Sequence, residues 1–202
     1  EVTEGVRQNV DLSLYERDFT RIHDIGAASD WLFDGLDHHH IRMGVQGVGH
    51  IYDPYRKMDM VLKVNSVKYD EAHGSSSLNY LGAEIAPYIE DEISLGERLK
   101  VDLGLRDALF LVKGRAYNRL EPRLAIRLDA APWVSLKASY AKMNQFSHLV
   151  SVCYIDLPTN LWMPSTSRVK PMSADQFVLG ALFTPSEKWN VDIEAFYKKM
   201  EH

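Results

Sequence analysis

Three consecutive histidines, His38, His39 and His40, are the residues that first suggest metal chemistry in this sequence. Imidazole nitrogens are common zinc ligands, but consecutive residues of a strand point to opposite faces and cannot converge on one ion. The histidines follow Asp37 and precede an alternating segment, so we interpret them as part of a solvated turn. The lone cysteine, Cys153, excludes an internal disulfide and a multi-cysteine zinc site. We therefore expect no metal site.

The acidic run Glu90, Asp91 and Glu92 could supply paired carboxylates for general acid–base catalysis. In a strand these neighbours diverge, and such a run beside a turn is usually solvated. The three glycines within residues 44–49 lack the spacing of a dinucleotide-binding loop, and inside a strand they favour a bend or a close approach of another backbone. The sequence holds no phosphate loop, nucleophile elbow or zinc-protease motif. We therefore expect no catalytic residue and no cofactor.

Charged side chains recur at every second position, opposite rows of apolar residues. They are Glu84, Lys100, Asp102, Arg106, Arg123, Arg127, Lys137, Asp192, Glu194 and Lys198. The interior of a small, fully packed barrel would not accept so many charges, whereas a wide lumen that holds water or a polar plug would. The alternative is a one-sided antiparallel sheet with its charged face in solvent and its apolar face on a protein core. Periodicity alone does not choose between lipid and core for the apolar face.

The elements that position these charges have a period of two residues, as in 99–106 and 189–198. This alternation predicts β-strands. We expect nine strands, at about residues 4–18, 20–34, 39–53, 79–93, 98–112, 115–129, 132–146, 173–185 and 189–202. Many have ~12–15 residues, against ~5–6 in ordinary globular proteins, as expected of tilted strands that cross a bilayer. The predicted fold is all-β: part of an antiparallel, up-and-down transmembrane β-barrel.

The connections between these strands differ in length on the two sides of the predicted sheet. Short connections lie near residues 34–39, 94–98, 129–132 and 185–189, whereas long ones cover 54–78 and 147–172. Short turns on one side and long loops on the other are typical of an outer-membrane barrel. An odd number of strands would leave the chain ends on opposite sides. We therefore expect residues 1–202 to be a piece of a barrel, without a plug domain.

Aromatic residues accompany the short turns: Trp31, Phe33, Trp133, Phe183 and Trp189. In a barrel they would share one membrane edge, because the amphipathic rings of Trp and Tyr favour the lipid–water interface. Ordinary packing at strand ends is the alternative.

Composition narrows the class of protein further. The chain has 202 residues, 46% of them hydrophobic, and a formal net charge of -5. This apolar content excludes disorder, and the acidic balance disfavours a nucleic-acid partner. No run approaches the ~18 apolar residues of a transmembrane helix, but a barrel strand needs only ~9–11 alternating residues.

The long segment 147–172 is unusually apolar for an exposed loop, and it holds Cys153, Tyr154 and Trp162. Such a loop could line the mouth of a ligand site, with Tyr154 and Trp162 as contacts. It could instead fold back on itself or on its neighbours. We favour the second interpretation, because nothing in the segment specifies a ligand.

Two stretches resemble the barrel of TonB-dependent outer-membrane receptors: YIEDEISLGERLKVDLGLR (88–106) and LEPRLAIRLDAAPWVSLKASYAKMNQ (120–145). The matching positions are Asp91, Glu92, Gly104, Leu105, Arg106, Glu121, Pro122, Arg123, Ser139 and Tyr140. The segments PTNLWMPSTSRVKPMSADQFVLG and EAFYKKM are similar to receptors of the Bacteroidetes type. The resemblance covers residues 79–202 through motifs and 1–78 through strand rhythm only.

This resemblance implies an outer-membrane protein of a Gram-negative cell, with a large barrel closed by an amino-terminal plug. Such receptors import a scarce nutrient, typically a ferric chelate, cobalamin or a glycan, driven by the TonB complex. The expected partners are the lipid bilayer, the plug domain of the same protein, the TonB complex and a small-molecule or glycan ligand. We expect Arg106, Arg123, Arg127 and Lys137 to contact plug or ligand through charge-assisted hydrogen bonds. Two alternatives are a soluble antiparallel β-sheet binding module and an outer-membrane enzyme, for which no nucleophile motif is found.

Overall fold

The structure is a computed structural model, and it describes residues 10–64, 67–77, 79–154, 157–186 and 188–201. These residues form the strands β1 (Val10–Leu36), β2 (His39–Val64), β3 (Val67–Ser77), β4 (Tyr80–Leu95), β5 (Leu99–Val112), β6 (Arg115–Ala131), β7 (Val134–Gln145), β8 (Ser147–Tyr154), β9 (Leu157–Pro164), β10 (Met172–Ser186) and β11 (Trp189–Glu201). Within the described part of the chain, no helix is long and apolar enough to cross a membrane.

The chain divides into two compact units. The smaller comprises Glu1–His23, Ile51–Tyr80 and Leu149–Met163, and the larger comprises Asp24–His50, Leu81–His148 and Pro164–His202. The smaller unit contains the antiparallel pairing of β2 with β3 and most of the β8–β9 pair. The larger unit contains most of a sheet with the strand order β1-β2-β4-β5-β6-β7-β10-β11, so neighbours in sequence are neighbours in the sheet apart from the inserted β3, β8 and β9.

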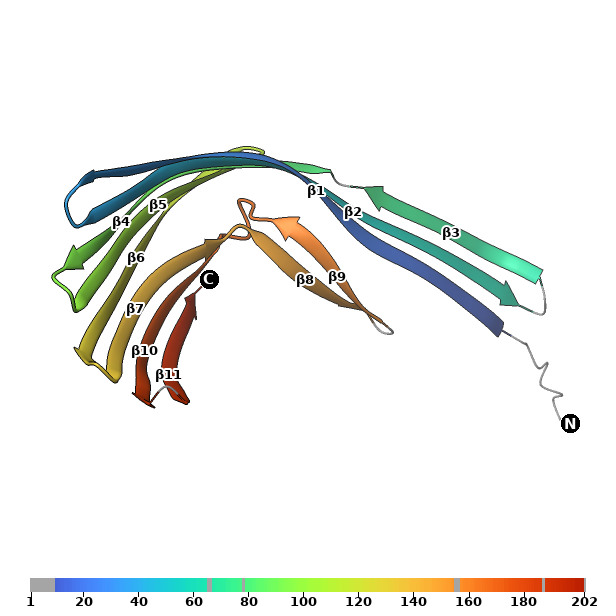
Figure 1. Ribbon diagram of the computed structural model, residues 1–202. Coiled ribbons are helices and arrows are strands. Elements are labelled where there is room, and N and C mark those ends of the chain that lie inside the picture. The colour runs from blue at the N-terminus through green and yellow to red at the C-terminus, as the bar shows by residue number, and fades with distance from the viewer. Residues whose placement is uncertain (1–9, 65–66, 78, 155–156, 187, 202) are drawn as a thin grey trace, which may run out of the picture. The chain divides into compact units, whose positions relative to one another are not determined.

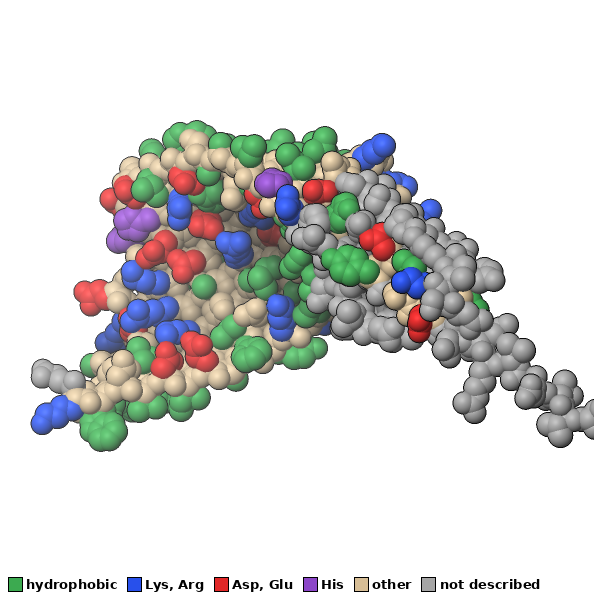
Figure 2. Space-filling view, turned by 90° about the vertical axis from the view of Figure 1, so that its right-hand side faces the viewer, with side chains coloured by type: hydrophobic (Ala, Val, Ile, Leu, Met, Phe, Trp, Pro, Cys, Tyr) green, Lys and Arg blue, Asp and Glu red, His purple; other side chains and the backbone are tan. Residues whose placement is uncertain are grey.

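The sheet of the larger unit is curved, as β4, β5, β6, β7, β10 and β11 show in Figure 1. Its strands pair antiparallel, and the register sorts side chains onto two faces. The row Lys100, Arg127 and Lys137 illustrates one face, because these residues are direct cross-strand partners. Figure 2 shows charged side chains gathered on the hollowed face and hydrophobic ones around the outside. We call the two surfaces the polar face and the apolar face.

The apolar face is exposed. Leu103, Leu179 and Ile193, from three different strands, are 47%, 66% and 60% exposed. The hydrophobic residues known to be buried in the larger unit are few: Ala86, Ala108, Phe110, Val112 and Phe146. In a water-soluble domain, an exposed apolar face like this one would cause aggregation. In a membrane barrel, lipid chains cover the apolar outer face.

The short connections have the conformations that tight hairpins need. His38 (φ 67°) joins β1 to β2, Gly96 (φ 70°) joins β4 to β5, and Gly114 (φ 76°) joins β5 to β6. Glycine adopts positive φ without steric cost, whereas a histidine there is strained. The His38 carbonyl accepts a hydrogen bond from the Ser94 amide at 2.8 Å, which ties this turn to the neighbouring strand.

Six of the predicted strands, those from residue 79 onward, are confirmed within two residues at both ends, whereas the predicted strand 39–53 has the right start and continues to Val64 as β2. The predicted strands 4–18 and 20–34 are one strand, β1, over its described residues Val10–Leu36. The path through the sheet therefore has eight strands, with β3 paired to β2 beside it, and the odd count predicted for the up-and-down path is wrong.

The segments predicted as long loops, 54–78 and 147–172, are largely strand. The first continues β2 and turns back as β3, and the second contains β8 and β9. A long connection satisfies its own backbone hydrogen bonds when it continues as an antiparallel ribbon, which is the physical reason for the difference. The prediction that 147–172 folds back on itself is therefore correct for the β8–β9 part.

Candidate functional site

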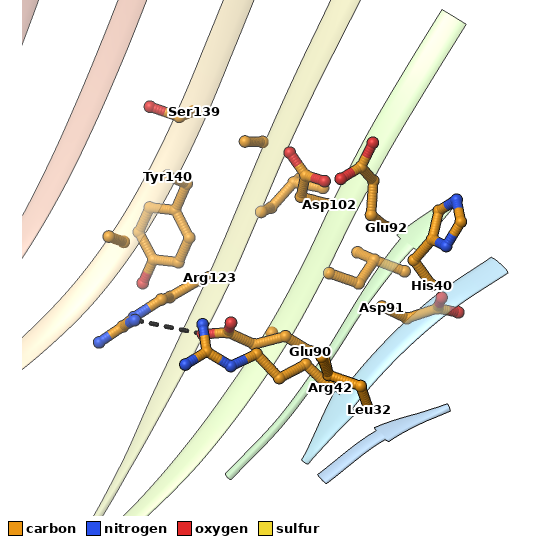
Figure 3. Close-up of a pocket in the computed structure, with 15 residues that line it drawn as sticks. Leu32, His40, Arg42, Glu90, Asp91, Glu92, Asp102, Arg123, Ser139 and Tyr140 are labelled. Carbon is orange, nitrogen blue, oxygen red and sulfur yellow. Dashed lines mark hydrogen bonds and ion pairs between the residues drawn. The ribbon is translucent and has the colours of Figure 1, made fainter. Parts of the chain in front are cut away.

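The polar face of the larger unit holds the charged residues predicted for the lumen. A hollow of about 530 Å³ opens on this face, lined by side chains from β1, β2, β4, β5, β6 and β7. Figure 3 shows Arg42, Glu90, Glu92, Asp102 and Arg123 around it. Each projects toward this face because alternate strand residues share a side of the sheet.

Arg106 lies at the centre of a half-buried ion-pair network. Its guanidinium donates to Glu84 at 2.6 Å and to Glu121 at 2.9 Å. Glu121 is only 3% exposed, and it also accepts hydrogen bonds from the backbone amide of Asn144 at 2.8 Å and from its side-chain amide at 3.2 Å. The β6–β7 pairing ends at Arg123–Ala141, so beyond this point the backbone amides of β7 no longer bond to β6. The Glu121 carboxylate takes the place of the missing backbone acceptor for Asn144. This network joins β4, β5, β6 and β7.

Lys100, Arg127 and Lys137 form a row of three cations across β5, β6 and β7. Like charges directly opposite one another destabilise a sheet. Each cation is compensated by an acid: Glu92 at 2.9 Å from Lys100, Asp129 at 3.2 Å from Arg127, and Asp192 at 3.5 Å from Lys137. All six side chains remain at least 39% exposed. The row therefore offers cations that water or another polar surface can reach.

Arg123 reaches its partner across an intervening strand. It pairs with Gly104 of β5 in the register, and Gly104 pairs with Glu90 of β4. The Arg123 and Glu90 side chains meet at 3.4 Å, and a Cβ added at Gly104 would lie 3.2 Å from Glu90 Cγ. Glycine at the middle position thus leaves room for a bridge between the two outer strands (Figure 3).

A second glycine acts in the same way. Tyr88 of β4 donates a hydrogen bond to Asp30 of β1, across Gly44 of β2. A Cβ on Gly44 would lie 2.7 Å from the backbone oxygen of Ser29, 2.8 Å from the Tyr88 ring and 2.8 Å from Asp30 Oδ1. The sequence predicted a bend or the approach of another backbone at the glycines of 44–49. The backbone approach is confirmed at Gly44, where the Ser29 carbonyl is the nearest atom, and the Tyr88 and Asp30 side chains use the same space.

The acidic run and the histidines diverge as their strand positions predict. Asp91 accepts a hydrogen bond from His39 at 2.8 Å, whereas Glu92 faces Asp102 in the hollow (Figure 3). His40 pairs instead with Asp34 at 2.9 Å. Within the residues that the structure describes, no group of three or more His, Cys, Asp or Glu side chains could hold a metal ion.

The ends of segment 147–172 pack onto the polar face. Phe146 stacks on Phe110 with ring centroids 4.9 Å apart, in a cluster with Ala108 and Val112. The Tyr117 hydroxyl donates to the Thr166 carbonyl at 2.5 Å. The segment is thus held at its base by an apolar cluster on an otherwise charged face.

The two residues proposed for a ligand mouth lie in the β8–β9 hairpin. Tyr154 ends β8 and its side chain lies outside the described residues, whereas Trp162 belongs to β9 and is 38% exposed.

Sequence reasoning found Arg106, Arg123, Arg127 and Lys137, and the register places all four on the polar face. It missed the partners Glu121 and Asn144, because a strand that leaves its ladder has no sequence signature. It also missed the bridging use of glycine, although a glycine in a charged row was a visible signal.

An antiparallel sheet with a charged concave face and an exposed apolar face has the architecture of the wall of a transmembrane β-barrel. The family model described as "TonB dependent receptor-like, beta-barrel" matches residues 4–202. The chain belongs to this family of outer-membrane receptors, and it is a protein of the outer membrane. The exposed apolar rows are therefore not the core of a soluble sheet module.

Comparison with solved structures gives a distant similarity. The alcaligin outer-membrane receptor FauA from Bordetella pertussis is 12% identical, with a TM-score of 0.42, and the match covers 96% of this chain and 37% of that one. The chain therefore spans little more than a third of the receptor that it matches. No curated protein matches it.

Proposed function

We propose that this chain forms part of the wall of a receptor that imports a scarce nutrient, with a plug domain of the same protein seated against the polar face. The observation that carries the proposal is the row of exposed cations Lys100, Arg127 and Lys137 on the concave side of a lipid-facing sheet. A sheet whose only role was to face lipid would not need charged side chains on its inner face.

The ion pairs of Arg123, Arg127 and Lys137 suit a surface that exchanges partners. Their distances are 3.4 Å, 3.2 Å and 3.5 Å, and their side chains are about half exposed. Exposed ion pairs contribute only ~0–1 kcal/mol, so a plug or ligand carboxylate can replace the present partner at little cost. We therefore assign contact with plug or ligand to these three residues.

Arg106 has a different task in this proposal. Its guanidinium is shared by two carboxylates at 2.6 Å and 2.9 Å, and its side chain is 22% exposed. Fewer of its donors remain for a third group, and moving it would leave the buried Glu121 without its cation. We assign Arg106 to holding β4, β5 and β6 together beneath the contact surface.

The nutrient is of the ferric-chelate, cobalamin or glycan class, and transport is driven by the TonB complex through another part of the protein. Extracellular segments capture the ligand, with Tyr154 and Trp162 at the mouth, and the plug then rearranges. Segment 147–172 leaves the sheet at the end away from the turn at 132–133, and outer-membrane barrels carry their longer connections on the extracellular side, which supports this assignment of the segment.

Uptake by cells that carry the full-length protein tests the proposal. Radiolabelled ferric chelates, cobalamin and oligosaccharides are supplied in turn, with and without a functional TonB complex. We expect TonB-dependent uptake of one class, and we expect Arg123→Ala to reduce it while heat-modifiable migration shows an assembled barrel. The matched control is Lys188→Ala, at the exposed turn between β10 and β11. Unchanged uptake in Arg123→Ala removes this residue from the contact surface, and the absence of TonB-dependent uptake for every class refutes the transport proposal.

A further inference from the structure

A second hollow, of about 710 Å³, opens where β6 and β7 separate. Its lining includes the cations Arg119, Lys142 and Lys170, together with Asn144, Ser173 and Glu201. It lies at the end of the sheet opposite the short turns at 37–38, 96–98 and 132–133. We refer to it as the cationic hollow.

The register places most of the cationic hollow on the apolar, lipid-facing side of the sheet. Lys142 follows Tyr140 by two residues, and Tyr140 lies in one cross-strand row with Phe177 and Tyr197. Asn144, Ser173 and Glu201 form the row four residues further along the same strands, beyond the row of Lys142, Asp175 and Lys199. The lipid-facing surface thus changes, within two rows, from aromatic to polar and charged side chains.

This order of rows marks the edge of the membrane. Rings of Tyr and Trp gather where hydrocarbon gives way to headgroups, and charged residues lie beyond them. Trp133 and Trp189, 53% and 68% exposed, lie at the opposite end of β7 and β11. The cationic hollow therefore lies at the headgroup level, on the side of the sheet that carries the long connections.

The cations of this hollow have no carboxylate partner. In the described part of the chain Arg119, Lys142 and Lys170 make no ion pair, whereas Glu201 is held by Lys199 at 2.5 Å. Asp175, the cross-strand neighbour of Lys142, accepts the hydroxyl hydrogen of Tyr140 at 2.7 Å. With Lys199 included, the group has four cations and two carboxylates, Asp175 and Glu201. Its net charge is therefore positive.

We propose that the cationic hollow binds the phosphate group of a lipid headgroup in the outer leaflet. A phosphate offers several strong acceptor oxygens and up to two negative charges, which matches unpaired Lys and Arg side chains beside the Ser173 hydroxyl. A soluble anion has no reason to select a lipid-facing site, whereas a lipid brings its phosphate to this depth and covers the neighbouring aromatic row with its chains. The site is separate from the polar face and does not rest on the transport proposal.

The test measures lipid retention by the full-length protein. The protein is reconstituted in phosphatidylcholine bilayers that contain lipid A with its phosphates, or lipid A from which the phosphates have been removed. Bound lipid A is then counted by native mass spectrometry. Wild-type protein should retain the phosphorylated form and lose the dephosphorylated one. The double variant Lys142→Gln/Lys170→Gln should bind the phosphorylated form roughly thirty-fold more weakly, since each lysine near a phosphate surface contributes about 1 kcal/mol.

A matched control removes the same number of positive charges at the same end of the sheet. Lys113→Gln/Arg115→Gln changes two exposed cations at the β5–β6 turn, outside the hollow, and should retain lipid A as wild type does. Equal losses in the two double variants would show a diffuse charge effect and overturn the proposal. Retention of dephosphorylated lipid A would overturn it as well. Displacement by inorganic phosphate at the same concentration as lipid A would assign the site to a free anion instead.

Discussion

Glu121 is the residue whose replacement most directly probes how the wall is held together. Its side chain is 4% exposed, and its carboxylate joins Arg106 at 2.9 Å to the Asn144 backbone amide at 2.8 Å. Glu121→Ala removes one charge-assisted bond, worth about 1.5–3 kcal/mol, and leaves a backbone donor without an acceptor, which costs about 1–3 kcal/mol. The sum, about 2.5–6 kcal/mol, brackets the cost of about 3–5 kcal/mol for breaking a buried ion pair by removing one partner.

The matched control is Glu90→Ala. Glu90 is also a glutamate on the polar face that pairs with an arginine, but its side chain is 39% exposed and lies 3.4 Å from Arg123. An exposed pair of this kind contributes ~0–1 kcal/mol. Glu121→Gln should fall between the two, because the amide oxygen still accepts the Asn144 hydrogen bond while the charge is lost.

The assay is urea unfolding of the full-length protein from phosphatidylcholine vesicles, followed by tryptophan fluorescence. The free energy of unfolding should fall by about 3–5 kcal/mol in Glu121→Ala and by at most about 1 kcal/mol in Glu90→Ala. Equal losses in the two variants would refute the argument that burial and the Asn144 contact distinguish Glu121.

Two further changes test features of the polar face. Gly44→Val should destabilise the full-length protein by about 1–3 kcal/mol in the same assay, because the new side chain meets the Ser29 carbonyl and displaces the Tyr88 ring. Gly47→Val should not, because its Cβ meets nothing nearer than 4.0 Å, and equal effects would contradict the special role of Gly44. Phe146→Ala should release the base of segment 147–172 and speed its cleavage by external protease on whole cells, since loss of a buried ring costs about 3–5 kcal/mol. The matched control, Leu149→Ala, changes an exposed residue and should be cleaved at the wild-type rate. If it were cleaved as fast as Phe146→Ala, the stacked ring would not be the anchor of the segment.

Local patterns predicted the strands of the sheet and the face on which each charge lies. Alternation from Leu99 to Arg106 is enough to place Asp102 and Arg106 opposite Leu103, because the strand period is two. The short turns were equally visible, since they interrupt that alternation. The prediction wrongly divided β1 at residues 18–20. The strand continues there without a break, but polar residues around this point resemble a turn in the sequence.

Features that depend on a third strand could not be predicted. Glu121 is an ordinary residue of a charged row until Asn144 leaves the ladder beside it. Gly44 makes room for Tyr88 and Asp30, two residues that are 58 positions apart and belong to strands on either side. The cationic hollow likewise combines β6 and β7 with the start of β10 and the end of β11. Such contacts follow from the register of the whole sheet.

The central claim is that one face of the sheet contacts lipid and the other a polar lumen. It is tested by nitroxide spin labels on the full-length protein in bilayers, with Cys153 replaced by serine and single cysteines introduced as Leu103→Cys and Asp102→Cys. Leu103 belongs to the apolar face and Asp102 to the polar face. The account predicts that oxygen dissolved in lipid relaxes the label at position 103 and that a water-soluble nickel chelate relaxes the label at 102. The reverse pattern, or nickel access at both positions, would contradict it.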